Sequence, residues 1–314
     1  MDPRSPAFAI TYANDRLNDG AGAQLHRIYG LYAVSRYLHV PYVHSPLKTI
    51  GYHGLRALED NAGFHDTESR YNRLCTVPSD VEVPHDPLVH DVTHADEIEY
   101  VREASAANGR FNLCRVLFPF SIADKHPEIY RCIAQLSPFR RPRLPWLRVA
   151  IHVRRGELYL FESQRMLPNA YYISCAQTVA GLLRARSIPF VCELYTEVPT
   201  KTFVVTPAHH GVEHRIPHDV VLGPEMNAVE EFDAIPNLRP RINIDPIEAL
   251  EGLATADVLI MSRSSFSYVA AILNPRGAIL CHPFWHSPLP EWILSDGDGR
   301  FSEAALLQQL AAWQ

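Results

Sequence analysis

Short apolar runs that alternate with helical patterns constrain the fold of this chain more than any other feature. In the second half, buried strands are predicted over residues 149–153, 189–195, 257–261 and 278–281. Helices with an apolar stripe are predicted between them, over residues 170–186, 245–256 and 268–273. Strands joined through helices pair in parallel, so this half predicts a parallel α/β sheet.

The first half begins with the same alternation. Phe8 to Tyr12 predicts a strand, residues 14–22 form a turn-rich loop, and a helical pattern starts at Ala23. Val40 to Val43 predicts the second strand of a βαβ unit. Further along, residues 96–107 and 128–136 predict helices, and residues 111–117 predict a strand or a loop.

A proline-rich stretch divides these two halves. Residues 137–145 hold three prolines and three arginines, which is typical of a linker. We therefore expect an N-terminal domain over residues 1–145 and a C-terminal domain over residues 146–314, facing each other across a cleft. A helix over residues 302–313 closes the chain, and its packing back on the first domain is left open.

Length, charge and cysteine usage exclude several classes of protein. The 314 residues suit two domains, and the net charge of −6 speaks against a nucleic-acid binder. Six cysteines without a CxxC pair favour buried free thiols and a reducing compartment. The N-terminus lacks a signal-peptide pattern, and no apolar run approaches the ~20 residues that cross a bilayer. These features predict a cytoplasmic protein without a membrane span, or a domain of a larger protein.

The strand over residues 149–153 ends in Arg154, Arg155 and Gly156. Two guanidinium groups at the end of a buried strand are costly unless an anion or a carboxylate meets them. Arginine matches phosphate oxygens two at a time, and Gly156 lets the backbone turn and approach a ligand. The stretch therefore predicts a phosphate clamp, and the alternative is a pair of arginines bound to surface carboxylates.

Polar groups also follow two other strands of the second domain. Thr196 and Glu197 follow one strand, and Ser264 and Ser265 precede a helix after another. In a parallel sheet these strand ends lie at the same edge, where hydroxyls and helix N–H groups can hold phosphate oxygens. The arrangement predicts a diphosphate site that needs no metal. The alternatives are N-capping by the serines, and a ribose contact or loop cap by Glu197.

Histidine-rich loops offer a competing interpretation as a metallohydrolase. The histidines concerned are His85, His90 and His94, and His209, His210 and His214. They lack a closing ligand at helical spacing, so we expect no metal site and no cofactor.

Two of these motifs, and less closely a third stretch near the N-terminus, resemble those of metal-independent fucosyltransferases. The stretch from His152 to Glu157 is similar to their HxRRxD-type motif. Residues 256–271 resemble the strand–SSFSW–helix segment of the α-1,2 group, and the loop from Arg16 through Gly22 to Gln24 is similar to its RLGNQ-type start. The resemblance implies a GT-B-like fold with two Rossmann-like domains, and a nucleotide-sugar donor.

The resemblance also implies roles for individual residues. Arg154 would grip the β-phosphate of GDP-fucose, Arg155 would assist or orient the loop, and His152 would shape the base of the clamp or be a buried structural residue. The remaining donor contacts would come from Gly22, Glu197, Asp245, Ser264, Ser265 and Phe266. Asp245 would contact guanine, although it also reads as the N-cap of a helix beginning at Pro246.

An inverting transfer needs a base for the acceptor hydroxyl, and two residues are candidates. Glu157 takes the acidic position of the motif, where the family has Asp. Glu162 lies eight residues beyond Arg154, which is similar to the spacing of a catalytic glutamate in the α-1,6 group. The apolar residues between them would raise a carboxyl pKa. The choice between the two stays open.

The sequence thus predicts an inverting, metal-independent glycosyltransferase that moves a sugar, fucose from GDP-fucose in the favoured version, to a glycan hydroxyl. Contacts to the acceptor are expected from the first domain, at Tyr42, His44, Tyr52 and His53. The alternatives are another donor, such as a UDP-pentose or another GDP-sugar, and a catalytically silent nucleotide-sugar-binding protein.

Overall fold

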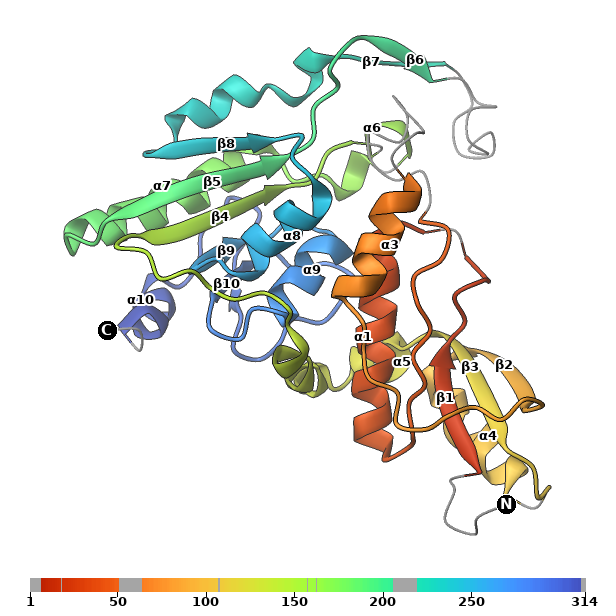
Figure 1. Cartoon of the computed structure of the whole chain (residues 1–314). Helices are drawn as coiled ribbons and strands as arrows, with labels where there is room; N and C mark the ends of the chain where they lie inside the picture. The colour runs from red at the N-terminus through yellow and green to blue at the C-terminus, as the bar shows by residue number, and fades with distance from the viewer. Residues whose placement is uncertain are drawn as a thin grey trace. The chain divides into compact units, whose positions relative to one another are not determined.

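Two parallel β-sheets, each in its own unit of the chain, organise the structure (Figure 1). It is a computed structural model, and it describes residues 7–17, 19–50, 64–106, 108–156, 158–161, 163–205 and 219–311. Unit 1 consists of Met1–Gly51, Phe64–Pro138 and Trp285–Pro290, and unit 2 of Tyr52–Gly63, Phe139–Phe284 and Glu291–Gln314. The boundary between Pro138 of unit 1 and Phe139 of unit 2 lies inside the predicted linker. The predicted α/β class with parallel sheets is confirmed, and the predicted cleft stays a prediction.

The sheet of unit 1 has three strands in the order β1-β3-β2, all parallel. They are β1 (Phe8–Tyr12), β2 (Leu88–His94) and β3 (Asn112–Phe118). The strand predicted over residues 40–43 is reduced to a single parallel bridge between Ile10 and Tyr42. Pro41 has no N–H to donate to β1, so the ladder cannot extend past it in that direction. The N–H of Tyr42 points away from β1 and donates to the Asp80 carboxylate at 2.7 Å.

Helix α1 (Ala21–Leu38) is the centre of unit 1, and its residues from Gln24 to Ser35 are all buried. It begins two residues before the predicted start, with Gly20 as its N-cap. A Cβ on Gly30 would lie 2.6 Å from the Pro119 side chain, so glycine permits the close packing there. The other helical segments of unit 1 are α3 (Phe64–Leu74), η1 (Ala95–Glu97), α4 (Ile98–Ser105), α5 (Phe120–Ala123) and η2 (Pro127–Leu136).

The region interpreted as a histidine-rich loop contains a strand. His90 and His94 lie in β2, which pairs with β3 at the edge of the sheet. An edge strand tolerates polar residues because one side of it meets solvent. The polar residues of β2 interrupt the apolar pattern by which a strand is predicted from sequence. The imidazole of His90 lies 3.0 Å from the side-chain oxygen of Asn112. Among the described residues there is no group of histidine, cysteine and carboxylate side chains that could hold a metal; His209, His210 and His214 lie outside them.

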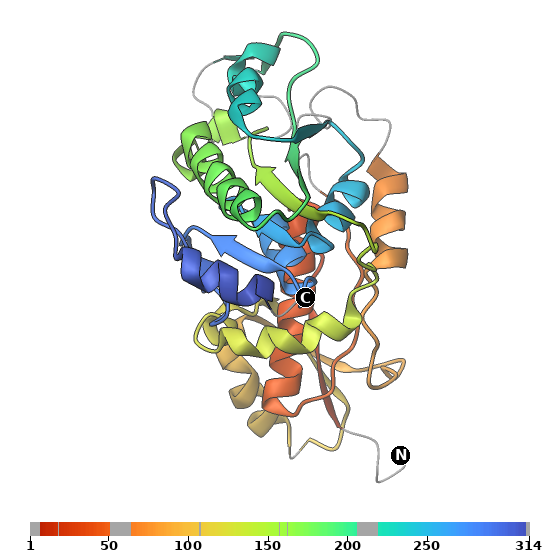
Figure 2. The same cartoon turned by 90° about the vertical axis from the view of Figure 1, so that its left-hand side faces the viewer.

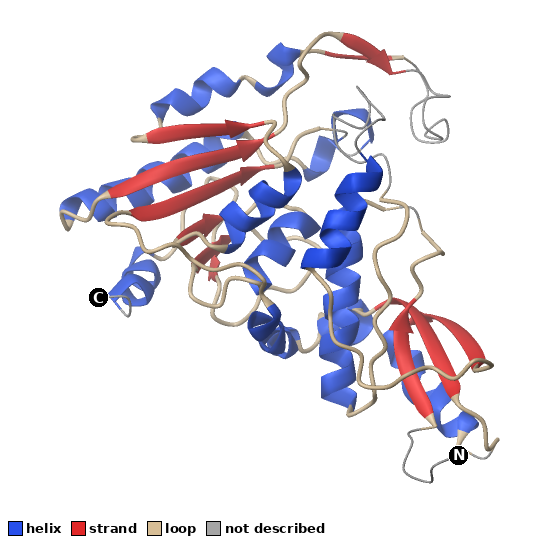
Figure 3. Cartoon of the chain, viewed as in Figure 1, coloured by secondary structure: helices blue, strands red, loops and turns tan. Residues whose placement is uncertain are grey.

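The sheet of unit 2 has six parallel strands in the order β11-β10-β9-β4-β5-β8, and the arrowheads of β4, β5 and β8 point the same way in Figure 3. The strands are β4 (Leu147–Val153), β5 (Phe190–Thr196), β8 (Leu238–Ile242), β9 (Val258–Ile260), β10 (Ala278–Cys281) and β11 (Ile293–Leu294). Strand β8 was not predicted, because Pro240 and two arginines break its apolar pattern. Its position at the edge of the sheet explains why proline is tolerated.

Helices cover both faces of this sheet. Val149, Ile151 and Val153 face α7 (Asn169–Ala185) and α10 (Glu303–Ala311), which lie on the same side of the sheet in Figure 2. The alternate residues of β4 face α8 (Pro246–Ala254) and α9 (Ser265–Ile272). Leu306 and Leu310 of α10 belong to the unit 2 core, and the packing of this helix on the first domain stays a prediction.

Smaller elements complete unit 2. Strands β6 (Phe203–Val205) and β7 (Val220–Leu222) form an antiparallel pair separate from the main sheet. Short helical turns are α6 (Leu158–Phe161), η3 (Ser163–Arg165), η5 (Pro224–Asn227) and η6 (Val229–Ala234). All six cysteines are free thiols, as expected. None of the helices in the described part of the chain is long and apolar enough to span a bilayer.

Candidate functional site

The polar strand ends of unit 2 lie at one edge of its sheet. Strand β4 runs between β9 and β5, with Ile151 opposite Ile260 and Val153 opposite Thr196. Because all three strands are parallel, the chain leaves the sheet on the same side at Arg154, at Glu197 and before Ser264. The predicted common edge is therefore present, and Arg154 occupies its middle.

Arg154 is partly accessible at this edge. Its side chain is 23% exposed, and its Nη1 lies 3.8 Å from Oε2 of Glu197, whose side chain is 35% exposed. This ion pair is longer than a hydrogen bond. Gly156, two residues on, has φ of +61°, a left-handed conformation that glycine adopts without strain. The turn that the sequence predicts after the strand is thus built as expected.

The loop that carries Glu197 is fixed by hydrogen bonds to its backbone. The Thr196 hydroxyl donates to the Val153 carbonyl at 2.8 Å, which joins the ends of β5 and β4. The Val198 N–H donates to the side chain of Asn243 at 2.9 Å, and the Asn227 amide donates to the Glu197 carbonyl. Glu197 therefore projects from a rigid loop beside Arg154.

Arg155 has a different environment from its neighbour. It is only 5% exposed, and its guanidinium donates to the Arg154 carbonyl at 2.9 Å and to the Asn169 side chain. It also lies 5.8 Å from the ring centre of Tyr172. These contacts suit the expected role of orienting the loop. They leave little of the side chain for a phosphate.

Helix α9 begins at this edge with Ser264 as its N-cap. The Ser264 hydroxyl accepts from the Phe266 N–H at 3.2 Å, and Ser265 is the first helical residue. The helix therefore starts three residues before the predicted Tyr268. Ser264 thus caps the helix, which confirms the N-capping that the sequence offered as the alternative to a phosphate contact. The N-terminus of α9 still brings backbone N–H groups and a positive dipole end to the edge that holds Arg154.

His152 lies behind Arg154 and contacts the same helix. Its Nδ1 is 2.8 Å from the Ser262 hydroxyl and also in hydrogen-bond contact with the Ser267 hydroxyl. Burial, and then the charges of Arg154 and Arg155, lower the pKa of His152 to about 3. The imidazole is therefore neutral at ordinary pH. Its ring centre lies 5.6 Å from that of Phe266.

Asp245 is the N-cap of α8, as the sequence predicts. Its Oδ1 accepts from the N–H groups of Ile247 at 2.9 Å and Glu248 at 3.3 Å. Strand β8 ends at Ile242, so Asp245 follows a strand end on the same edge of the sheet. Its contact with guanine stays a prediction.

Two of the four expected acceptor residues, Tyr42 and His44, belong to unit 1, and one of these two is corrected. Tyr42 is fully buried, with its ring edge-on to Tyr32 at 5.6 Å, so it is a core residue and cannot contact an acceptor. His44 is half-buried, and burial lowers its pKa. Gly22 is a buried residue of the first turn of α1. Tyr52 and His53 lie outside the described residues, as do Glu157 and Glu162, the two candidate bases.

Gln24, in the N-terminal motif, ties a loop of unit 1 to helix α1. Its amide donates to the carbonyls of Asp19 at 2.8 Å and Lys48 at 2.9 Å, and its oxygen accepts from the Lys48 N–H at 3.1 Å. These contacts give Gln24 a structural role in the loop that follows β1.

Several contacts that shape the unit 2 edge were not predicted from the sequence. Ser262 and Ser267 contact His152, and Asn227 and Asn243 hold the Glu197 loop. The two serines flank the N-cap in Ser262-Arg-Ser-Ser-Phe-Ser267, and this spacing was an available signal. The asparagines lie 30 and 45 residues from their partners, so no local pattern marks them.

Comparison with known proteins gives weak structural likenesses only. No protein-family model matches the chain, and no curated protein matches it. Among solved structures, E. coli heptosyltransferase WaaC with ADP is similar at 11% identity and a TM-score of 0.42, covering 98% of this chain and 99% of that chain. The same enzyme with ADP-2-deoxy-2-fluoro heptose gives 11% identity, the same coverage and a TM-score of 0.38. At these values neither likeness identifies the family of this chain.

Proposed function

We propose that this protein is a glycosyltransferase of the GT-B type whose unit 2 binds the diphosphate of a nucleotide sugar. The observation that carries the proposal is the position of Arg154. Arg154 directly follows β4, the middle strand of β9-β4-β5. The N-terminus of α9 follows the end of β9, and Glu197 follows the end of β5. A guanidinium and a helix N-terminus at one edge suit two linked phosphate groups.

The chemistry that follows is an inverting transfer without a metal. A base removes the proton of the acceptor hydroxyl, whose oxygen forms a bond to the anomeric carbon of the sugar. The bond from that carbon to the diphosphate breaks, and its electron pair leaves with the diphosphate. Arg154 and the N–H groups of α9 stabilise the negative charge that develops there. Glu157 and Glu162 both remain candidates for the base.

GDP-fucose is the donor that we propose, with a glycan hydroxyl as acceptor. The support is the resemblance of residues 152–157 and 256–271 to fucosyltransferase motifs. A UDP-pentose or another GDP-sugar would bind the same clamp, because the clamp contacts the diphosphate rather than the sugar or the base. A silent nucleotide-sugar-binding protein would use the clamp without turnover.

A binding panel followed by a turnover assay tests this function. A donor at 100 times its dissociation constant stabilises the native state by about 2.7 kcal/mol, which a thermal shift detects. We expect GDP-fucose to raise the melting temperature more than GDP-mannose, UDP-xylose or ADP, with or without EDTA. A shift without hydrolysis or transfer favours the silent binder. No shift with any nucleotide sugar contradicts the proposal.

Arg154→Ala provides the matched variant for this panel, with Arg140→Ala as its control, because Arg140 is exposed and lies in the linker. The shift should disappear in Arg154→Ala and persist in Arg140→Ala. Equal loss in both variants would indicate a general effect of positive charge rather than a site at Arg154.

A further inference from the structure

We infer that His152 is a positioning residue for the diphosphate site, which holds the end of β4 and the first turn of α9 in register through Ser262 and Ser267. The inference rests on the proposed function, because it assigns His152 a part in that site. It differs from a direct donor contact, since His152 acts here through Arg154 and α9.

The geometry joins the two segments that carry the site. His152 lies two residues before Arg154, and Ser262 and Ser267 lie on either side of the N-cap Ser264. All three members of the cluster are buried, and Ser267 is completely so. The Ser262 hydroxyl is 2.8 Å from Nδ1 of His152 and 3.0 Å from the Ser267 hydroxyl. A shift of β4 relative to α9 would break these contacts.

The hydrogen positions follow from counting donors. The Ser262 N–H donates to the Ser267 oxygen at 3.3 Å. If Nδ1 accepts, the Ser267 hydroxyl donates to Nδ1 and the Ser262 hydroxyl donates to Ser267, so each proton of the cluster has an acceptor. If Nδ1 carried the proton and donated to Ser262, only one of the two buried serine hydroxyls could donate to the other, and the proton of the remaining hydroxyl would have no acceptor within the cluster. The geometry therefore favours the neutral tautomer with its proton on Nε2.

In this tautomer the two ring nitrogens of His152 have different roles. Nδ1 is used inside the cluster, and a neutral ring adds no positive charge beside Arg154. A displacement of about 1 Å at a reacting group can cost ~10²-fold in rate, so a residue that sets spacing can matter without touching the substrate. Loss of the Nδ1 acceptor should therefore lower turnover.

Two substitutions of His152 distinguish the role of Nδ1 from that of Nε2. His152→Asn places an amide oxygen near the position of Nδ1, whereas His152→Gln reaches the position of Nε2. We expect His152→Asn to retain kcat/KM within about tenfold, and His152→Gln and Ser267→Ala to lose up to ~10²-fold. The double variant His152→Gln/Ser267→Ala should lose no more than either single variant, because both remove the same contact.

A measurement on the unmodified protein complements the variants and does not depend on their folding. Nitrogen-15 NMR of the histidine rings should show His152 neutral, with its proton on Nε2, from pH 5 to pH 8. A proton on Nδ1 would overturn the inference, and so would an active His152→Gln beside an inactive His152→Asn. If the unmodified protein bound no nucleotide sugar, the proposed function would fail, and the NMR result would then show whether the cluster itself is described correctly.

Discussion

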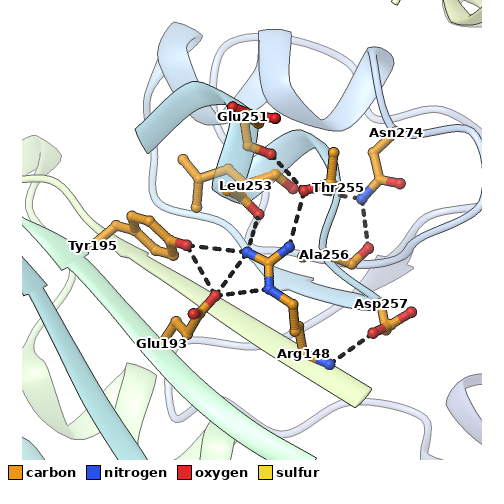
Figure 4. A network of polar contacts seen from close by, with 10 residues as sticks. Arg148, Glu193, Tyr195, Glu251, Leu253, Thr255, Ala256, Asp257 and Asn274 are labelled. Atoms are coloured by element: carbon orange, nitrogen blue, oxygen red, sulfur yellow. Dashed lines mark hydrogen bonds and ion pairs between the residues drawn. The ribbon is translucent and has the colours of Figure 1, made fainter. Parts of the chain in front are cut away.

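Two arginines six residues apart, Arg148 in strand β4 and Arg154 directly after its end, differ in their exposure and in their position on the sheet. Arg148, at the start of the strand, has a side chain that is 11% exposed and donates to Glu193 at 2.7 and 2.9 Å (Figure 4). It also donates to the Thr255 hydroxyl at 2.9 Å and to the Gly252 carbonyl at 3.1 Å. Arg154, at the end, is 23% exposed and forms an ion pair of 3.8 Å.

The difference separates a structural charge from a functional one. The guanidinium of Arg148 is surrounded by fixed acceptors from β5 and from the segment around α8, so it joins these elements to the sheet. The backbone of α8 approaches this network closely, because a Cβ on Gly252 would lie 2.2 Å from the Tyr195 hydroxyl. Arg154 lies instead at the carboxyl edge, where parallel sheets bind their ligands. The same residue type thus serves folding at one end and, in our proposal, catalysis at the other.

The largest effect is expected on folding, from Arg148→Ala. This substitution leaves the Glu193 carboxylate, which is only 14% exposed, without its cation, and should cost up to about 3–5 kcal/mol, the range for a fully buried pair. Urea unfolding monitored by circular dichroism measures the loss. Arg154→Ala is the matched control, and its partly exposed ion pair should cost no more than about 1 kcal/mol.

A double variant shows whether the charge itself matters at Arg148. Arg148→Met combined with Glu193→Leu removes both charges and keeps most of the apolar volume, so it should recover much of the stability. If Arg148→Ala and Arg154→Ala lowered the unfolding free energy equally, Arg148 would not have the special structural role that distinguishes it from Arg154.

The next effect is expected on catalysis, from the other end of the strand. Arg154→Ala removes a charge that stabilises the leaving diphosphate, and kcat/KM should fall by about 10²–10³-fold. Arg154→Lys keeps the charge without the planar fork, so it should recover only part of the loss. Steady-state kinetics with the donor identified by the binding panel measure both variants. Turnover that is unchanged in Arg154→Ala would refute the clamp.

The sequence singles out Arg154 because it follows the carboxyl end of a predicted strand, but it does not predict the structural role of Arg148, and the reason is physical. Both flank the same apolar run, and the partners of Arg148 at Glu193 and Thr255 lie 45 and 107 residues away. The parallel sheet and the common edge were predictable because they follow from local alternation. Likewise, the N-cap at Asp245 has a local signature. Burial of Tyr42 was not predictable, since an aromatic residue suits a core as well as a binding surface.

A pH dependence of stability tests His152, which lies between the two ends of the strand. Its pKa is about 3 in the folded chain against an ordinary value of 6.5, so the unfolded chain binds a proton that the folded chain does not. Its contribution is complete above pH 6.5 and is lost as pH falls toward 3, by about 1.4 kcal/mol per pH unit.

The measurement compares unfolding free energies of the unmodified protein and His152→Asn at pH 7 and pH 5. The difference between the two proteins should change by about 2 kcal/mol over this range, because asparagine does not titrate. A difference that is independent of pH would mean that the imidazole of His152 is not held neutral by its surroundings.

The smallest effect is expected from the two N-caps at this edge, Ser264 and Asp245. Replacing either by alanine removes a hydrogen bond to a helix N-terminus, and each should cost ~1 kcal/mol of unfolding free energy. Only Ser264→Ala should also weaken donor binding, because α9 faces the clamp of Arg154 in our proposal, whereas α8 follows the edge strand β8. Calorimetric titration with the donor distinguishes them. If Asp245→Ala weakens binding as much, Asp245 contacts the nucleotide as the fucosyltransferase resemblance implies, and the site extends across the edge from β9 to β8.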